Sequence, residues 1–92
     1  MPLTRRVNFK APLRKQNRLR VPRVVRSQFK LETSEVTKVT VSVAGTISVK
    51  ESFFGKIRND GYITAPAVVV ALLKGEKSSL EGYVLEVTLE PA

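Results

Sequence analysis

The sequence contains no cysteine and no histidine among its 92 residues, and it has no tryptophan. Without cysteine, neither disulfides nor thiolate metal sites can hold the fold. Without histidine, the commonest general base and the commonest metal ligand are both missing. No apolar run approaches the roughly 18 residues of a membrane span, and the start Met-Pro-Leu-Thr-Arg-Arg lacks the apolar core of a signal peptide. We therefore expect a soluble, cytoplasmic protein with no membrane contact and no metal site.

Acidic residues are missing from the first third of the chain. Residues 1–30 contain ten Lys and Arg and no Asp or Glu, whereas residues 31–92 contain six Lys and Arg and eight Asp and Glu. The net charge of +8 therefore comes from the first third alone. A basic surface of this kind predicts a polyanionic partner.

One segment of the sequence occurs twice. The pattern of Arg18–Leu31 returns 44 residues later in Tyr62–Gly75, with Pro22 corresponding to Pro66. Further apolar positions correspond at the same spacing: Phe9 with Phe53, Leu13 with Ile57, Leu19 with Ile63, and Phe29 with Leu73. A chain of this length forms one small domain. We expect a single domain, residues 1–92, made of two copies of one unit at about 5–43 and about 46–90.

Each copy reads as strand, turn, strand, short helix and strand. Val7 and Phe9 alternate with polar residues as on a half-buried strand. Arg14–Asn17 predicts a tight turn, and its counterpart Arg58–Gly61 predicts one more strongly because Asp-Gly tolerates positive φ. The second strand alternates between faces, with Leu19 and Val21 inward and Arg18 and Arg20 outward.

Pro22 ends this strand and suits the first helical position, which predicts a helix of about two turns over residues 23–30. Val68–Val70 alone would favour a strand, but the repeat predicts a helix there. Because this second helix is apolar nearly all round, we expect it to be the more buried of the two.

Alternating strands follow each helix. Val39, Val41 and Val43 are expected to point inward with Thr40 and Ser42 outward, and Leu85, Val87 and Leu89 inward in the second copy. Ala44-Gly45 predicts a turn into a strand over Thr46–Phe54, with Ile47 and Val49 inward. Residues 1–4 and 91–92 are expected to fray. Three strands per copy predict a mainly β fold: a six-stranded closed β-barrel with pseudo-twofold symmetry and one short helix per half.

The segment Asn17-Arg18-Leu19-Arg20-Val21-Pro22-Arg23-Val24-Val25-Arg26 resembles the AbrB-like family of small DNA-binding barrels. A typical half of that family reads Gly-Arg, two apolar residues, proline, a basic residue and a short helix. Two such halves in one chain resemble the cradle-loop barrels, in particular the small archaeal RIFT-barrel proteins. The resemblance implies a barrel that is complete as a monomer, and it carries the family's DNA-contacting arginine over to Arg18.

Eight basic residues are candidates for a nucleic-acid surface, because phosphate binding needs several cations on one face. They are Arg14, Lys15, Arg18, Arg20, Arg23, Arg26, Lys30 and Arg58. Nonspecific DNA or structured RNA is the expected partner. The alternatives are a solubilising charge run, and a protein-interaction module that docks on an acidic protein or a ribonucleoprotein. Phe54 or Tyr62 could add base stacking, or could cover an end of the barrel.

Catalysis is not expected. The eight acids are scattered one at a time, at Glu32, Glu35, Glu51, Asp60, Glu76, Glu81, Glu86 and Glu90, so no pair is placed for acid–base work. The glycines form no nucleotide-binding motif. We therefore predict no enzyme activity, no cofactor and no small-molecule substrate.

Overall fold

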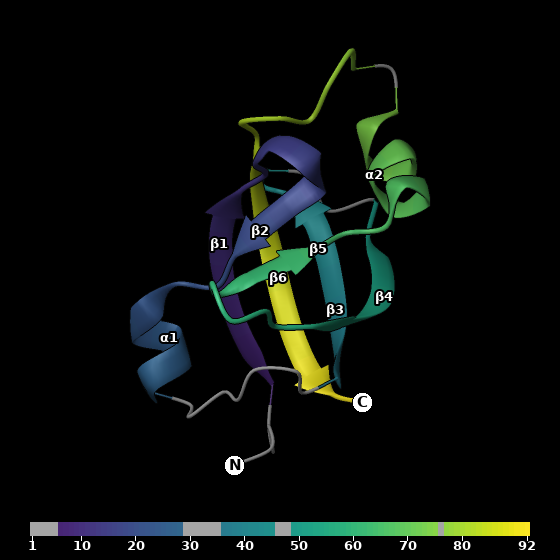
Figure 1. Cartoon of the computed structure of the whole chain (residues 1–92). Coiled ribbons are helices and arrows are strands. Elements are labelled where there is room, and N and C mark those ends of the chain that lie inside the picture. The colour runs from purple at the N-terminus through teal and green to yellow at the C-terminus, as the bar shows by residue number, and fades with distance from the viewer. Residues whose placement is uncertain (1–5, 29–35, 46–48, 76) are drawn as a thin grey trace.

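The computed structural model describes residues 6–28, 36–45, 49–75 and 77–92. Among these residues the fold is mainly β, with six strands and two short helices (Figure 1). The elements in chain order are β1 (Val7–Pro12), a 3-10 turn (Lys15–Asn17), β2 (Arg18–Arg20), α1 (Arg23–Gln28), β3 (Val36–Val43), β4 (Glu51–Lys56), β5 (Tyr62–Thr64), α2 (Ala67–Lys74) and β6 (Val84–Pro91). Strand, strand, helix and strand thus follow one another twice, as the repeat predicts.

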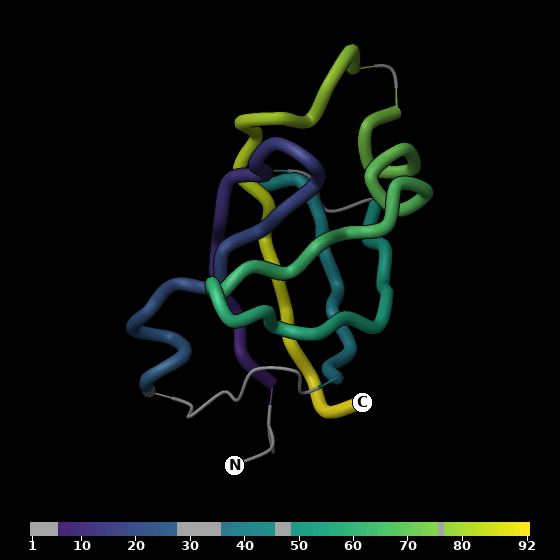
Figure 2. The backbone as a smooth tube through the Cα atoms, in the orientation of Figure 1, coloured from purple at the N-terminus to yellow at the C-terminus, as the bar shows by residue number. Residues whose placement is uncertain are grey.

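The strands form two antiparallel sheets. One has the order β1-β6-β3-β4, and the other is a ribbon of β2 and β5. The ribbon lies across one face of the larger sheet, and α1 and α2 stand on opposite sides of the molecule (Figures 1 and 2). The ladders recorded among the described residues do not join the two sheets into one closed cylinder. The closed barrel therefore stays a prediction, while the six strands and two helices are confirmed.

The core lies between the ribbon and the large sheet. Leu19 and Ile63 face inward from the ribbon with no exposed surface, and Leu85, Val87 and Leu89 of β6 face them at 1% exposure or less. Each of these aliphatic side chains contributes about 1.5–3 kcal/mol when it is fully buried. The alternation that the sequence predicts for these strands is therefore confirmed.

The strand register is the same when the two copies are exchanged. In the ribbon Leu19 pairs with Ile63, and these two residues are counterparts in the repeat. In the large sheet Val41 pairs with Val87, which are counterparts across β3 and β6. Two further hydrogen bonds are equivalent: the Val21 amide donates to the Gly61 carbonyl and the Ala65 amide donates to the Asn17 carbonyl, at 2.9 and 2.8 Å. This self-consistent register is what a twofold relation between the copies requires.

The helix predicted at Val68–Val70 is confirmed, because these three valines lie within α2. Pro66 precedes the helix in extended conformation, and the chain leaves it at Gly75 with φ +56°. Val69 and Leu73 are buried, whereas Val68 and Leu72 are exposed. α2 thus has the more buried residues among the described side chains of the two helices, but only one of its faces reaches the core.

Four details of the sequence prediction are wrong. Ser42 is buried, because both faces of the central strand β3 are covered near its end. Val49 is 41% exposed, because β4 begins only at Glu51 and strand alternation does not extend beyond the paired residues. Pro91 does not fray but pairs with Thr37. Pro22 precedes α1 rather than occupying its first position. The predictions for Ile47, and for the helix beyond Gln28, lie outside the described residues.

Candidate nucleic-acid interface

The outward face of the β2–β5 ribbon carries two of the predicted arginines. Because Leu19 is fully buried and strand side chains alternate, Arg18 and Arg20 point away from the core, with Arg20 exposed and Arg18 half-buried. Across the ribbon Arg18 pairs with Thr64 and Arg20 with Tyr62. The prediction that the two arginines share an outer face is confirmed.

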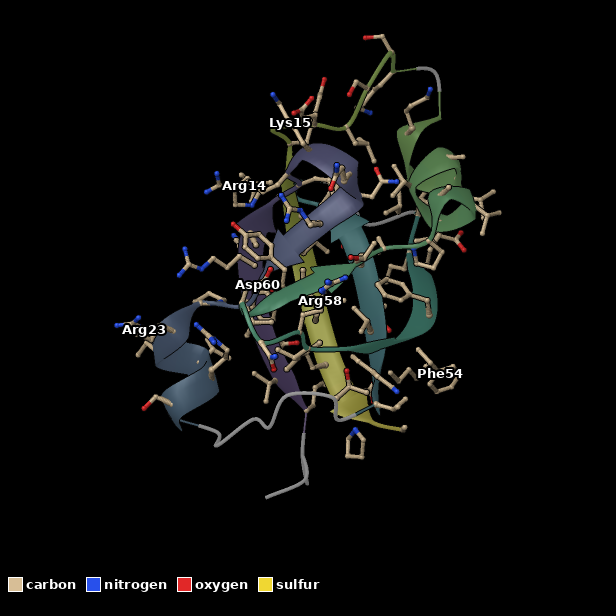
Figure 3. All side chains as sticks on the ribbon, viewed as in Figure 1. Arg14, Lys15, Arg23, Phe54, Arg58 and Asp60 are labelled. Carbon is tan, nitrogen blue, oxygen red and sulfur yellow. The ribbon has the colours of Figure 1, made fainter. Side chains whose placement is uncertain are left out.

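The turns before β2 and β5 bring three more cations to this side of the molecule. The Arg14 amide donates to the Arg18 carbonyl at 2.8 Å, and the equivalent Arg58 amide donates to the Tyr62 carbonyl at 2.9 Å. Arg14, Lys15 and Arg58 are all exposed. Figure 3 shows Arg14 and Lys15 around the turn before β2, and Arg58 over β5. Both ends of the ribbon therefore carry positive charge.

Arg18 lies over the ring of Tyr62. Its guanidinium carbon is 4.9 Å from the centre of the ring, and its Nε donates to the Lys15 carbonyl at 3.3 Å. A cation over an aromatic face within about 6 Å is attracted by the ring quadrupole, by about 0.5–1 kcal/mol at exposed sites. These two contacts hold the Arg18 side chain along the ribbon surface rather than free in solvent.

An open pocket of about 470 Å³ lies beside this pair. Its lining residues are Pro12, Leu13, Arg14, Lys15, Arg18, Tyr62, Glu81 and Gly82. Leu13 is buried, whereas Arg14, Lys15 and Glu81 are exposed. The pocket thus combines apolar surface and an aromatic ring with three cations and one carboxylate.

The helix cations are placed differently from one another. Arg23 is exposed at the start of α1 and projects away from the body of the molecule (Figure 3). Arg26 is half-buried against the turn before β5, where a Cβ added at Gly61 would lie 2.8 Å from its Cζ. The Nε of Arg26 is buried and has no hydrogen-bond partner among the described residues. Arg26 therefore packs on the turn before β5. The remaining candidate of this segment, Lys30, lies outside the described residues.

Carboxylates neutralise cations on the other side of the molecule. Arg6 Nη2 lies 3.3 Å from Glu90 Oε2, and Lys10 Nζ lies 3.9 Å from Glu86 Oε1. These residues point away from the ribbon, because Leu85, Val87 and Leu89 occupy the alternate positions of β6 on its inner face. Within the described ranges, none of the candidate cations of the ribbon, its turns and α1 makes such a pair.

Two of the acids that the structure describes lie on the ribbon side. Asp60 lies in the turn before β5, where its Oδ1 accepts a hydrogen bond from the Tyr62 amide at 3.1 Å, and Glu81 lines the pocket. In the described part of the chain no three Asp or Glu residues gather closely enough to hold a metal ion. No helix there is long and apolar enough to cross a membrane.

The sequence reasoning missed two features of this site: Arg18 lying on Tyr62, and Glu81 lining the same pocket. The repeat contained a signal for the first. If the copies are related by a twofold axis that passes between Leu19 and Ile63, Tyr62 must lie diagonally across the ribbon from Arg18. Glu81 comes from the segment between α2 and β6, where the two copies differ in length, and no local pattern placed it.

Comparison with known proteins finds a solved structure with a similar fold but does not assign the chain to a family. The structure is similar to the solution structure of PHS018 from Pyrococcus horikoshii, with a TM-score of 0.75 over 99% of this chain and 94% of that one. The two sequences are 16% identical, so the similarity concerns the fold alone. No family model matches the sequence, and no curated protein matches it either.

Proposed function

We propose that this chain is a non-catalytic protein that binds nucleic acid, without sequence preference, through the outer face of the β2–β5 ribbon. The binding residues are Arg14, Lys15, Arg18, Arg20, Arg23 and Arg58. They contact phosphates, while Arg26 supports the turn on which Arg58 stands. DNA and structured RNA both present the phosphate spacing that such a face accepts.

One observation carries the proposal: among the described cations of residues 6–28, those on the outer face of β1 and β6 have different surroundings from those on the ribbon side. On the outer face of β1 and β6, Arg6 and Lys10 lie close to Glu90 and Glu86. On the ribbon side, the candidate cations have no carboxylate partner among the described residues. Cations without a neighbouring carboxylate attract a polyanion and release its counterions on binding.

The proposal includes the barrel architecture and a role like that of AbrB-like regulators or chromatin proteins. Two equivalent hydrogen bonds support this architecture, since the Arg14 amide closes the turn between β1 and β2 and the Arg58 amide closes the turn between β4 and β5. A chain that contains both halves needs no second copy to complete its core, so we propose a monomer.

The test is the salt dependence of binding to a duplex DNA and to a hairpin RNA, measured by fluorescence anisotropy. Contact with about four or five phosphates gives a slope of log K against log salt of about −3 to −5. The variant Arg18→Ala/Arg20→Ala is expected to bind more weakly, with a slope flatter by about 1–2. If neither the duplex DNA nor the hairpin RNA binds at low salt, the proposal is wrong.

The matched control is Lys38→Ala/Lys56→Ala, which removes the same amount of charge from exposed positions of β3 and β4 in the large sheet. Because these lysines lie outside the proposed face, their loss is expected to change the slope little. Equal losses from both double variants would mean that only the net charge of +8 matters. An acidic polypeptide that competes as well as DNA would favour the alternative, docking on an acidic protein.

A further inference from the structure

The ribbon face offers an aromatic ring as well as charge. Tyr62 is half-buried on the outward side of β5, and the Arg18 guanidinium carbon lies 4.9 Å from its ring centre. The hydrogen bond from Arg18 Nε to the Lys15 carbonyl keeps this guanidinium along the surface. Aromatic rings and arginine planes are the groups on which proteins stack unpaired bases.

The pocket beside this pair has the size and lining for one base. Its volume of about 470 Å³ falls within the roughly 300–1,000 Å³ of pockets that hold small organic ligands. Leu13 and Pro12 supply apolar surface, and the exposed residues Arg14 and Lys15 also line the pocket. A carboxylate among phosphate-binding cations would repel a phosphate, but Glu81 can accept a hydrogen bond from the N–H groups of a base.

We propose that this pocket binds an unpaired nucleobase, which stacks against Tyr62 and Arg18 while Arg14 and Lys15 contact the neighbouring phosphates. The inference rests on the proposed function and narrows it to single-stranded nucleotides. The phosphates of a duplex can contact the cations of this face. Its bases stay stacked on one another, so they cannot reach the ring of Tyr62. Binding is insensitive to sequence because every base presents a flat face.

The ring can be observed directly, because the chain has two tyrosines and no tryptophan. In the variant Tyr83→Phe, tyrosine emission comes from Tyr62 alone. Titration with oligothymidylate is expected to quench this emission, after correction for absorption by the DNA, with the same midpoint as the anisotropy change. Inorganic polyphosphate, which has charge but no bases, is expected to bind without quenching. Equal quenching by polyphosphate, or binding of oligothymidylate without quenching, overturns the inference.

Affinities of variants give the second test. Tyr62→Leu is expected to weaken binding of oligothymidylate by about 5- to 150-fold, the usual effect of losing one base–aromatic stack, and to leave duplex affinity within about twofold. Tyr62→Phe keeps the ring and is expected to bind like the parent. The matched control is Tyr83→Leu, because the Tyr83 ring also has a cation near it, Lys77 at 5.8 Å, but does not line the pocket.

The two proposals fail in different ways. If neither single strand nor duplex binds at low salt, the proposed function fails, and this inference fails with it. If both bind with steep salt slopes while Tyr62→Leu changes nothing, the face binds phosphates alone and only the stacking inference is wrong. Thermal unfolding of each tyrosine variant shows whether an affinity loss comes from unfolding, and the quenching experiment does not need a substitution at Tyr62.

Discussion

Replacing Gly61 by alanine tests how the first helix is attached to the turn before β5. Gly61 has φ +84°, a conformation that side chains with a Cβ rarely adopt. An added Cβ would also lie 2.8 Å from Cζ, 3.0 Å from Nη1 and 3.1 Å from Nη2 of Arg26. The substitution therefore adds backbone strain and a steric conflict with the guanidinium.

These two effects can be separated with a matched glycine. Gly82 has φ +86°, and a Cβ there would meet nothing within 4 Å. Gly82→Ala thus carries the strain alone, about 1–2 kcal/mol. Gly61→Ala carries the same strain and must also displace the guanidinium to the ordinary contact distance of about 3.5–4 Å. Because the guanidinium ends a flexible side chain, we expect an additional cost near the low end of overpacking, about 1 kcal/mol.

The assay is thermal unfolding followed by circular dichroism. For a domain of this size 1 kcal/mol corresponds to a change in Tm of about 4–8 °C, so Gly61→Ala is expected to melt lower than Gly82→Ala by about that amount. In an Arg26→Ala background the two alanine variants are expected to cost the same. If Gly61→Ala costs no more than Gly82→Ala in the parent chain, Arg26 does not pack on the turn, and it returns to the set of candidate phosphate contacts.

Two further predictions concern the core and the ion pairs. Leu89→Ala, at a position with no exposed surface, is expected to lower the free energy of unfolding by about 2–5 kcal/mol, whereas Phe54→Ala, at 68% exposure, is expected to change it by less than about 0.5 kcal/mol. Urea denaturation measures both, and a comparable loss at Phe54 would mean that its ring is packed in solution. Glu86→Gln/Glu90→Gln is expected to cost less than about 1 kcal/mol per ion pair and to leave the salt slope of nucleic-acid binding unchanged; a steeper slope would show that Arg6 and Lys10 can also reach phosphates.

The repeat and the alternation within each copy predicted most of the fold. Alternation places Leu19 inward and Arg18 outward because successive strand residues point to opposite faces, whatever the partner strand is. The repeat also overruled the strand preference of Val68–Val70, since its counterpart in the first copy reads as a helix. Ser42 and Val49 were assigned wrongly because burial depends on what covers a strand and where pairing begins, and neither is a local property.

The candidate site was predicted only in its composition. The sequence places ten cations and no acid in the first thirty residues, and the structure divides the eight that it describes between two environments. Arg6 and Lys10 lie beside acids of the second copy, because β1 pairs with β6 in a register that sets Lys10 opposite Glu86. A count of charges along the chain cannot predict the pairing of β1 with β6.

The sequence by itself determined that there are two copies of one unit, which residues of each strand face the core, and where the positive charge lies along the chain. Only the tertiary structure decided which side chains meet across the copies. Arg18 reaches the ring of Tyr62, and Arg26 packs on Gly61, through contacts between residues more than thirty positions apart. Local periodicity fixes the face of a residue, whereas its neighbours on that face depend on the register of long-range pairing, which one copy read alone does not specify.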